Sequence, residues 1–246
     1  KVYTPAVDAL AKEGMRFNNF YTNQAICAPS RSPIFTGMHP VKNGCMANHL
    51  GVKPNIKTVI SYMEAEGYDV VLAGKGHVKP NFIFKWSEYF KSVDHRFLPL
   101  EKLETFFETA KKPFCVFIAS DFPHGPYPKN STYSKEDIFR LPYDRRYIPN
   151  FKPGYYQNIK DDNAQLERVL AIIEANNLIQ NSIFIYASDH GISGKWGVSE
   201  QGLKVPFIVR WPEEVAANSV SETLLNFVDI LPTFLDIIGA EIPKNI

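Results

Sequence analysis

Residues 182–191 read SIFIYASDHG. The first seven are rich in β-branched and aromatic side chains, which predicts a buried strand that ends at the Asp-His-Gly sequence. Residues 161–177, which precede this strand, carry apolar side chains at helical spacing and two acids in the first turn. They predict an amphipathic helix, and the apolar run at residues 205–211 predicts another strand. Helices that alternate with strands indicate an α/β fold.

The same alternation extends over the whole chain of 246 residues. Further helices are predicted at residues 5–12, 56–66, 100–111 and 230–238, and further strands at residues 69–73 and 114–119. We therefore expect a single domain over residues 1–246, an α/β sandwich with a mostly parallel central sheet and helices on both faces.

Polar side chains that could take part in catalysis or ligand binding follow three of the predicted strands. They are Lys75 and His77, Asp121 and His124, and Asp189 and His190. Ligands of parallel sheets bind beyond the carboxyl ends of the strands, so these side chains mark a candidate site. Residues 123–160 are rich in Pro, Tyr and Asn and lack periodicity. They predict a long active-site loop region.

Composition excludes several classes of protein. The formal net charge is +1, which gives no global field for nucleic acid or an anionic membrane, and no apolar run is long enough to span a bilayer. No signal peptide is visible after Lys1. The three cysteines lack the spacing of a metal site. Cys115 lies in an apolar run and is expected in the core, and Cys45 follows a probable loop glycine.

Cys27 differs from the other two cysteines. Residues 27–31 read CAPSR, and Thr36-Gly37 follows. This pattern resembles the signature of type I sulfatases, members of the alkaline phosphatase superfamily. The resemblance implies that a maturation enzyme oxidises Cys27 to formylglycine. One hydroxyl of the hydrated aldehyde would attack the sulfur of a sulfate ester, and the other would expel the sulfate. The alternative interpretation is a buried thiol before a helix.

Two further motifs keep the order of that family. Residues 74–77 read GKGH and residues 123–126 read PHGP. The resemblance implies that Lys75 bridges nucleophile and sulfate, that His77 helps to deprotonate the hydrate, and that His124 contacts the sulfate near the leaving oxygen. A solvated lysine and structural histidines are the alternatives.

The Asp-His-Gly turn resembles the metal-binding turn of the family. This implies that Asp189 and His190 bind a divalent cation, usually Ca²⁺, together with the modified Cys27. A strand-ending turn capped by Asp189 is the alternative. Lys195 resembles the family's sulfate-binding lysine that supports leaving-group protonation, and Lys204 competes for that assignment.

The predicted cations would surround one small anion. Arg31, Lys75, Lys195 and His124 would stabilise a dianion-like transition state, because donors positioned beforehand in a dry pocket are effective there. The family also supplies two metal-binding aspartates from a first strand, which would lie before Lys1. The chain is therefore expected to lack that strand and the family's C-terminal subdomain.

Three functions remain open from the sequence. The first is a sulfatase of small-molecule or oligosaccharide sulfates, closest in appearance to heparan N-sulfatases, which cleave a sulfamate. The second is a phosphomonoester or phosphonate ester hydrolase of the same superfamily. The third is a truncated, non-catalytic homologue that binds glycans. The resemblance implies a periplasmic, secreted or lysosomal location.

Overall fold

The computed structural model describes residues 2–134, 136–137, 153–191 and 195–246. The helices are α1 (Pro5–Glu13), α2 (Cys27–Thr36), α3 (Pro40–Asn43), α4 (Val59–Ala65), α5 (Leu100–Thr109), α6 (Pro153–Ala175), α7 (Glu200–Leu203) and α8 (Ile230–Ile237). The strands are β1 (Met15–Tyr21), β2 (Asp69–Gly74), β3 (Glu88–Phe90), β4 (Phe114–Ala119), β5 (Phe184–Ala187), β6 (Phe207–Arg210) and β7 (Ser219–Asn226). Short 3₁₀ turns lie at Ile179–Asn181 and Phe227–Asp229.

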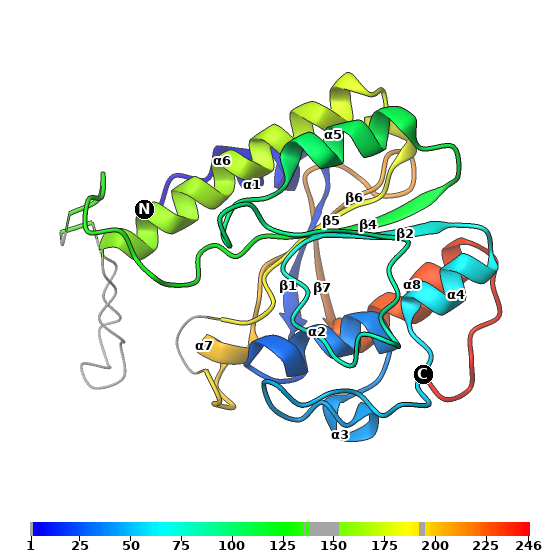
Figure 1. The fold of residues 1–246 in the computed structure, drawn as a ribbon. Coiled ribbons are helices and arrows are strands. Elements are labelled where there is room, and N and C mark those ends of the chain that lie inside the picture. The colour runs from blue at the N-terminus through cyan, green and yellow to red at the C-terminus, as the bar shows by residue number, and fades with distance from the viewer. Residues whose placement is uncertain (1, 135, 138–152, 192–194) are drawn as a thin grey trace.

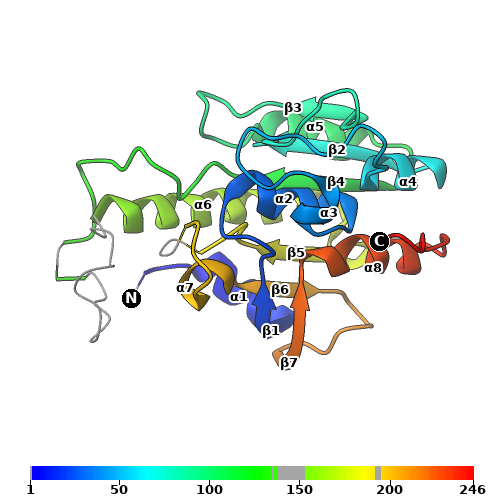
Figure 2. The ribbon, with the colours of Figure 1, turned by 90° about the horizontal axis from the view of Figure 1, so that it is seen from below.

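The strands form two hydrogen-bonded sheets. One is three-stranded in the order β3-β2-β4, and the other is four-stranded in the order β5-β6-β1-β7. In Figure 2 the strands follow one another from β3 through β4 and β5 to β7, so both sheets lie in one twisted layer. The predicted α/β sandwich is confirmed.

The predicted parallel arrangement has one exception. The pairs β2–β3, β2–β4 and β1–β7 are parallel, whereas β6 runs antiparallel to both β1 and β5. Parallel neighbours need a crossover of a dozen or more residues, usually a helix. The described part of the connection between β5 and β6 contains only the four-residue α7. The sheet is therefore mostly parallel, as predicted, with β6 as the antiparallel exception.

Helices cover both faces of this layer (Figure 1). Side chains alternate along β2, so Val70 and Val71 face opposite sides. Val71 belongs to a cluster with Leu103 of α5 and Val169 of α6. Val70 belongs to a second cluster, with Phe35 of α2, residues of α4 and residues of α8. The central strand is thus buried on both sides, which explains its continuous apolar sequence.

The helix α6 is longer than the sequence predicts. It begins at Pro153, a residue favoured in a first helical turn, and not at residue 161. The predicted loop at residues 123–160 is therefore wrong for residues 153–160, and residues 135 and 138–152 lie outside the described residues. Buried polar side chains obscure the helical pattern: Asn158 donates to the carbonyl of His124 at 3.1 Å, and Asn163 accepts from the backbone N–H of Ala6 at 3.0 Å.

The other two cysteines occupy structural positions. Cys115 lies in β4, and burial raises the pKa of its thiol to about 12, as expected for a core cysteine. Cys45 is buried, and its Sγ donates to the carbonyl of Leu50 at 3.3 Å. Within the described residues, no helix has both the length and the apolar character needed to cross a membrane.

Candidate active site

Cys27 is the first residue of α2 and is only 3% exposed. The extended backbone of Ile26 leads into the helix, and Asn48 accepts the N–H of Ala28 at 3.0 Å. Gly37 closes the helix in the left-handed conformation at φ 63°, and its N–H donates to the carbonyl of Pro33. The residues that form the predicted signature therefore start, fill and end one short buried helix.

His190 lies against Cys27. Its Nε2 is 3.5 Å from Cys27 Sγ, while its Nδ1 donates to the carbonyl of Gly191 at 2.8 Å. Burial raises the pKa of the Cys27 thiol, but interactions with His190 and His77 outweigh burial and bring this pKa down to about 5. Burial lowers the pKa of His190, yet its contacts with Cys27 and Asp189 raise the pKa overall. The geometry therefore favours a thiolate facing an imidazolium.

The turn after β5 is fixed by close backbone packing. Gly191 donates to the carbonyl of Gly202 at 2.8 Å. A Cβ at Gly191 would lie 2.0 Å from the carbonyl oxygen of Gln201, so no side chain fits there. Ser30 donates from its hydroxyl to the carbonyl of Asp189, and Thr22 donates to Ser30 Oγ at 2.8 Å. These contacts join α2 to the Asp-His-Gly turn.

Arg31 connects the turns after two strands. Its Nε donates to Asp189 Oδ2 at 3.1 Å, and its Nη1 donates to the carbonyl of Lys75 at 2.8 Å. Burial raises the pKa of Asp189, but the charges of Arg31, His190 and Lys75 lower it overall. Asp189 is therefore a carboxylate throughout the neutral range.

Lys75 has an acidic partner at the end of the neighbouring strand. Its Nζ lies 3.9 Å from Asp121 Oδ1, and Ser92 donates to Asp121 Oδ2 at 2.8 Å. The N–H of Lys75 donates to the carbonyl of Ala119 at 2.8 Å, which joins the ends of β2 and β4. The sequence places Asp121 at a strand end, but no motif predicts its pairing with Lys75.

His77 and His49 form a histidine pair at the site. Both have left-handed backbones, at φ 55° and 73°, a conformation that non-glycine residues adopt at a cost. Their ring centroids are 5.7 Å apart. The Nδ1 atom of His77 is buried and has no hydrogen-bond partner among the described residues. No sequence motif identifies His49.

His124 and Lys195 are both exposed. His124 Nδ1 donates to the carbonyl of Gly125 at 2.9 Å, and Arg96 donates to the carbonyl of His124 at 3.3 Å. Next to Lys195, the N–H of Trp196 donates to the carbonyl of Ala25 at 3.0 Å, two residues before Cys27. In the described part of the chain, no hydrogen bond or ion pair joins the His124 or Lys195 side chain to Cys27, Arg31 or Lys75.

The predicted metal ligands come together. One ligand atom each from Cys27, Asp189 and His190 lies within 4.8 Å of the other two. Calcium prefers about six to eight oxygen ligands, and Asp189 supplies a carboxylate of the required kind. The Sγ atom occupies the position at which a formylglycine would present oxygen. The described donor set thus fits one side of a divalent-cation site.

Comparison with known proteins agrees with this geometry. A family model described as Sulfatase matches residues 1–240. The chain belongs to the sulfatase family. It is 46% identical over 256 residues to an ulvan-active sulfatase of Formosa agariphila, a match that covers 100% of the chain and 51% of that protein. The suspected membership of the type I sulfatases is confirmed at the level of the family.

Solved structures of related folds resemble the chain closely. A putative sulfatase, yidJ, of Bacteroides fragilis superimposes with a TM-score of 0.82 at 19% identity, covering 99% of the chain and 70% of that structure. A phosphonate monoester hydrolase of Agrobacterium radiobacter gives a TM-score of 0.80 at 16% identity, covering 97% and 69%. At these identities the likeness shows the fold alone. The chain spans between 51% and 60% of the length of three curated relatives, which are two ulvan-active sulfatases of Formosa agariphila and arylsulfatase K of Canis lupus familiaris.

Proposed function

We propose that the protein to which this sulfatase-family chain belongs hydrolyses a sulfate ester of a sulfated glycan, with residue 27 as its nucleophile. The observation that carries the proposal is the convergence of Cys27, Asp189 and His190 within 4.8 Å, with Arg31 hydrogen-bonded to Asp189. A nucleophile position, a metal position and a fixed cation meet at one point. The relative named an ulvan-active sulfatase supports a polysaccharide sulfate as substrate.

Residue 27 would act after oxidation to formylglycine by a maturation enzyme. The modification supplies a hydrated aldehyde whose hydroxyl is the nucleophile toward sulfur. His190 and His77 lie against this position and hold or accept its proton. Burial excludes bulk water from the nucleophile, so the histidines determine its protonation.

Asp189 and His190 would hold a divalent cation, which we propose to be Ca²⁺. The cation neutralises charge on the sulfate oxygens when bound. Arg31 keeps Asp189 ionised through the contact at 3.1 Å, and so keeps a carboxylate ready for the metal. Because calcium prefers about six to eight oxygens, further ligands would come from other parts of the full-length protein.

The cationic residues would divide between the sulfate and the leaving group. Arg31 and Lys75 are the two that are tied to the centre, so we assign them to the sulfate. His124 and Lys195 are exposed to solvent, from which a sugar would approach, so we assign them to the leaving oxygen. Residues 1–246 would form part of one catalytic domain, in a periplasmic, secreted or lysosomal protein.

The test uses the full-length protein, produced together with a formylglycine-generating enzyme. Ion chromatography would measure sulfate released from ulvan oligosaccharides and from an aryl sulfate. We expect release of sulfate from both, and loss of release in a Cys27→Ala variant. Turnover by the Cys27→Ala protein equal to that of the wild type would refute the proposal.

A second candidate activity is phosphonate or phosphate ester hydrolysis. The fold likeness to the phosphonate monoester hydrolase, with a TM-score of 0.80, favours its inclusion. Phosphonate monoesters, phosphate monoesters and a sulfamate should be assayed beside the sulfate esters. The highest kcat/KM identifies the reaction, and a sulfamate preference would support the heparan N-sulfatase type. Glycan binding without any hydrolysis would identify a non-catalytic homologue.

A further inference from the structure

A cavity of about 460 Å³ opens beside the proposed reaction centre. His77 lines it, and the same side chain interacts with Cys27. The other wall residues that bear on its chemistry are His49, Lys79, Lys85, Trp86 and Tyr89. A group bound in this cavity would therefore be a near neighbour of the sulfate under attack.

The lining of this cavity is cationic. It includes Lys79 and Lys85, and none of its lining residues is an Asp or a Glu. In the described ranges neither lysine forms an ion pair, whereas Lys75 is paired with Asp121 and Lys112 with Asp69. Both lysines are exposed. Two uncompensated ammonium groups favour an anionic occupant.

One wall of the cavity is aromatic and rigid. Trp86 packs edge-to-face on Phe35, with ring centroids 5.2 Å apart, so its indole is fixed from behind. Tyr89 lies in β3, held in register opposite Leu72, and is 46% exposed. An exposed aromatic ring beside fixed apolar surface suits the flat, partly apolar face of a sugar ring.

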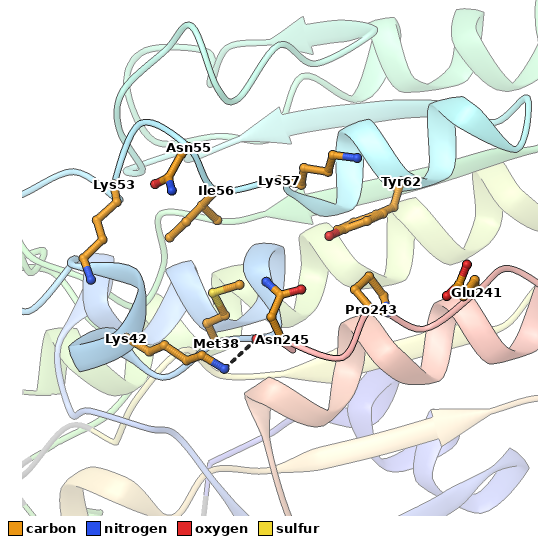
Figure 3. Close-up of a pocket in the computed structure, with 10 residues that line it drawn as sticks. All are labelled: Met38, Lys42, Lys53, Asn55, Ile56, Lys57, Tyr62, Glu241, Pro243 and Asn245. Carbon is orange, nitrogen blue, oxygen red and sulfur yellow. Dashed lines mark hydrogen bonds between the residues drawn. The ribbon is translucent and has the colours of Figure 1, made fainter.

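A second cavity is also lined by lysines and by one aromatic ring, that of Tyr62. Its volume is about 630 Å³, and Figure 3 shows Lys42 of α3 with Lys53 and Lys57 from the segment before α4. Here the lining includes an acid, Glu241, and Lys42 already donates to the carbonyl of Asn245 at 2.6 Å. None of the residues that we assign to catalysis lines it. It serves as a control site of similar residue content.

We infer that the cavity between His77 and Lys85 is a saccharide subsite that binds an anionic sugar linked to the one that loses its sulfate. Lys79 and Lys85 bind the anion, a carboxylate or a second sulfate, and Tyr89 and Trp86 contact the ring. The inference rests on the proposed function and deepens it by specifying the substrate as a polyanionic oligosaccharide.

The kinetic test uses the full-length, matured protein. Lys79→Ala, Lys85→Ala and Tyr89→Ala are compared with the control Lys53→Ala. With sulfated ulvan oligosaccharides, each of the two lysine variants should raise KM about tenfold, the usual scale for one lost charge-assisted contact. With a small aryl sulfate, kcat/KM should stay within about twofold of wild type, because that substrate does not reach the cavity. Lys53→Ala should leave both substrates unaffected.

A binding measurement separates this inference from the proposed function. Calorimetry with Cys27→Ala protein, which has no nucleophile at position 27, measures oligosaccharide affinity without turnover, and Lys79→Ala and Lys85→Ala introduced into it should weaken binding about tenfold. Carboxyl-reduced oligosaccharides identify the anion: if the lysine effect persists the anion is a sulfate, and if it vanishes the anion is a carboxylate. Affinity that does not depend on either lysine overturns the inference, even if the enzyme cleaves sulfate esters. Lysine-dependent binding without hydrolysis supports the subsite and refutes only the proposed function.

Discussion

Arg31 donates from Nε to Asp189 Oδ2 over 3.1 Å, although the two residues are 158 positions apart in the chain. The contact holds the first turns of α2 against the turn after β5, with side chains that are 11% and 22% exposed. Arg31 also reaches the carbonyl of Lys75, so a single guanidinium joins three of the segments that carry candidate site residues. This arrangement makes Arg31 a structural residue in addition to its proposed role at the sulfate.

The first prediction concerns that guanidinium. Arg31→Ala should lower kcat/KM for sulfate esters by about 10²- to 10³-fold, the usual cost of losing one positioned donor. It should also lower the free energy of unfolding by about 3 kcal/mol, because Asp189 is left without its partner. Arg31→Lys keeps the charge but cannot make both hydrogen bonds, so its effects should be intermediate. Kinetics and thermal unfolding check both; an Arg31→Ala protein with wild-type kinetics would contradict the assignment.

The second prediction concerns the modification of residue 27. In an active preparation of the full-length protein, mass spectrometry of the Cys27 peptide should detect the aldehyde. Cys27→Ala should lose turnover almost wholly, because no neighbouring side chain offers two hydroxyls on one carbon. A preparation that turns over while Cys27 remains a thiol in every molecule would exclude formylglycine chemistry.

The third prediction separates His124 from Lys75 by leaving group. His124→Ala should lower kcat/KM for sugar sulfates by about 10²- to 10⁴-fold, the range of general acid catalysis, and should affect aryl sulfates much less. An aryl leaving group needs little protonation. Lys75→Ala should slow both substrates alike, since Lys75 is the residue assigned to the sulfate itself. Equal losses in His124→Ala would assign that residue to sulfate binding.

The fourth prediction concerns metal removal. Treatment of the full-length protein with a chelator should abolish turnover, and added Ca²⁺ should restore it. Asp189→Asn should bind Ca²⁺ at least tenfold more weakly, because a neutral amide replaces the carboxylate that the cation requires. Metal content and Ca²⁺ titration of activity measure both effects. Full activity in the presence of chelator would remove the metal from the mechanism.

The fifth prediction concerns Asp162 of α6. Burial raises the pKa of its carboxyl from 3.8 to about 6, although Ser120 opposes the shift. A pKa that is higher in the folded state means that the folded protein binds the proton more tightly, so this residue costs stability as pH rises from 4 through 6. Asp162→Asn should therefore gain roughly 3 kcal/mol of unfolding free energy relative to wild type at pH 7, and little at pH 4. Denaturant unfolding at the two pH values measures the gap; a gap independent of pH would contradict it.

The sequence predicted the buried strands better than the exposed ones. Residues 69–73 and 114–119 correspond to β2 and β4, whose continuous apolar runs are covered on both faces. The strands β1, β3 and β7 were not predicted. In β1, Asn18 and Asn19 interrupt the apolar pattern, and both donate to Glu222 of β7. Cross-strand hydrogen bonds of this kind leave no periodic signal, and neither does the reversed direction of β6.

The candidate site was predictable where motifs carry it. The order of motifs led us to expect that the motif residues lie together. The structure brings together six of them: Cys27, Arg31, Lys75, His77, Asp189 and His190. Contacts made through space have no such signature. The approach of His49 to His77 and the pairing of Lys75 with Asp121 depend on how loops cross the ends of the strands. The roles of His124 and Lys195 stay predictions.

The burial of Cys27 in the folded chain bears on when its thiol could be oxidised relative to folding. Cys27 is only 3% exposed and contacts His190, which lies 163 residues further along the chain. Another enzyme therefore has no access to the Cys27 thiol once folding is complete. On the proposed function, oxidation must then act on the nascent or unfolded polypeptide. A nascent chain in which residue 190 has not yet been synthesised still presents its thiol. Slow synthesis would lengthen the time during which the thiol is accessible. Rapid folding of unmodified protein would bury the thiol before it is oxidised.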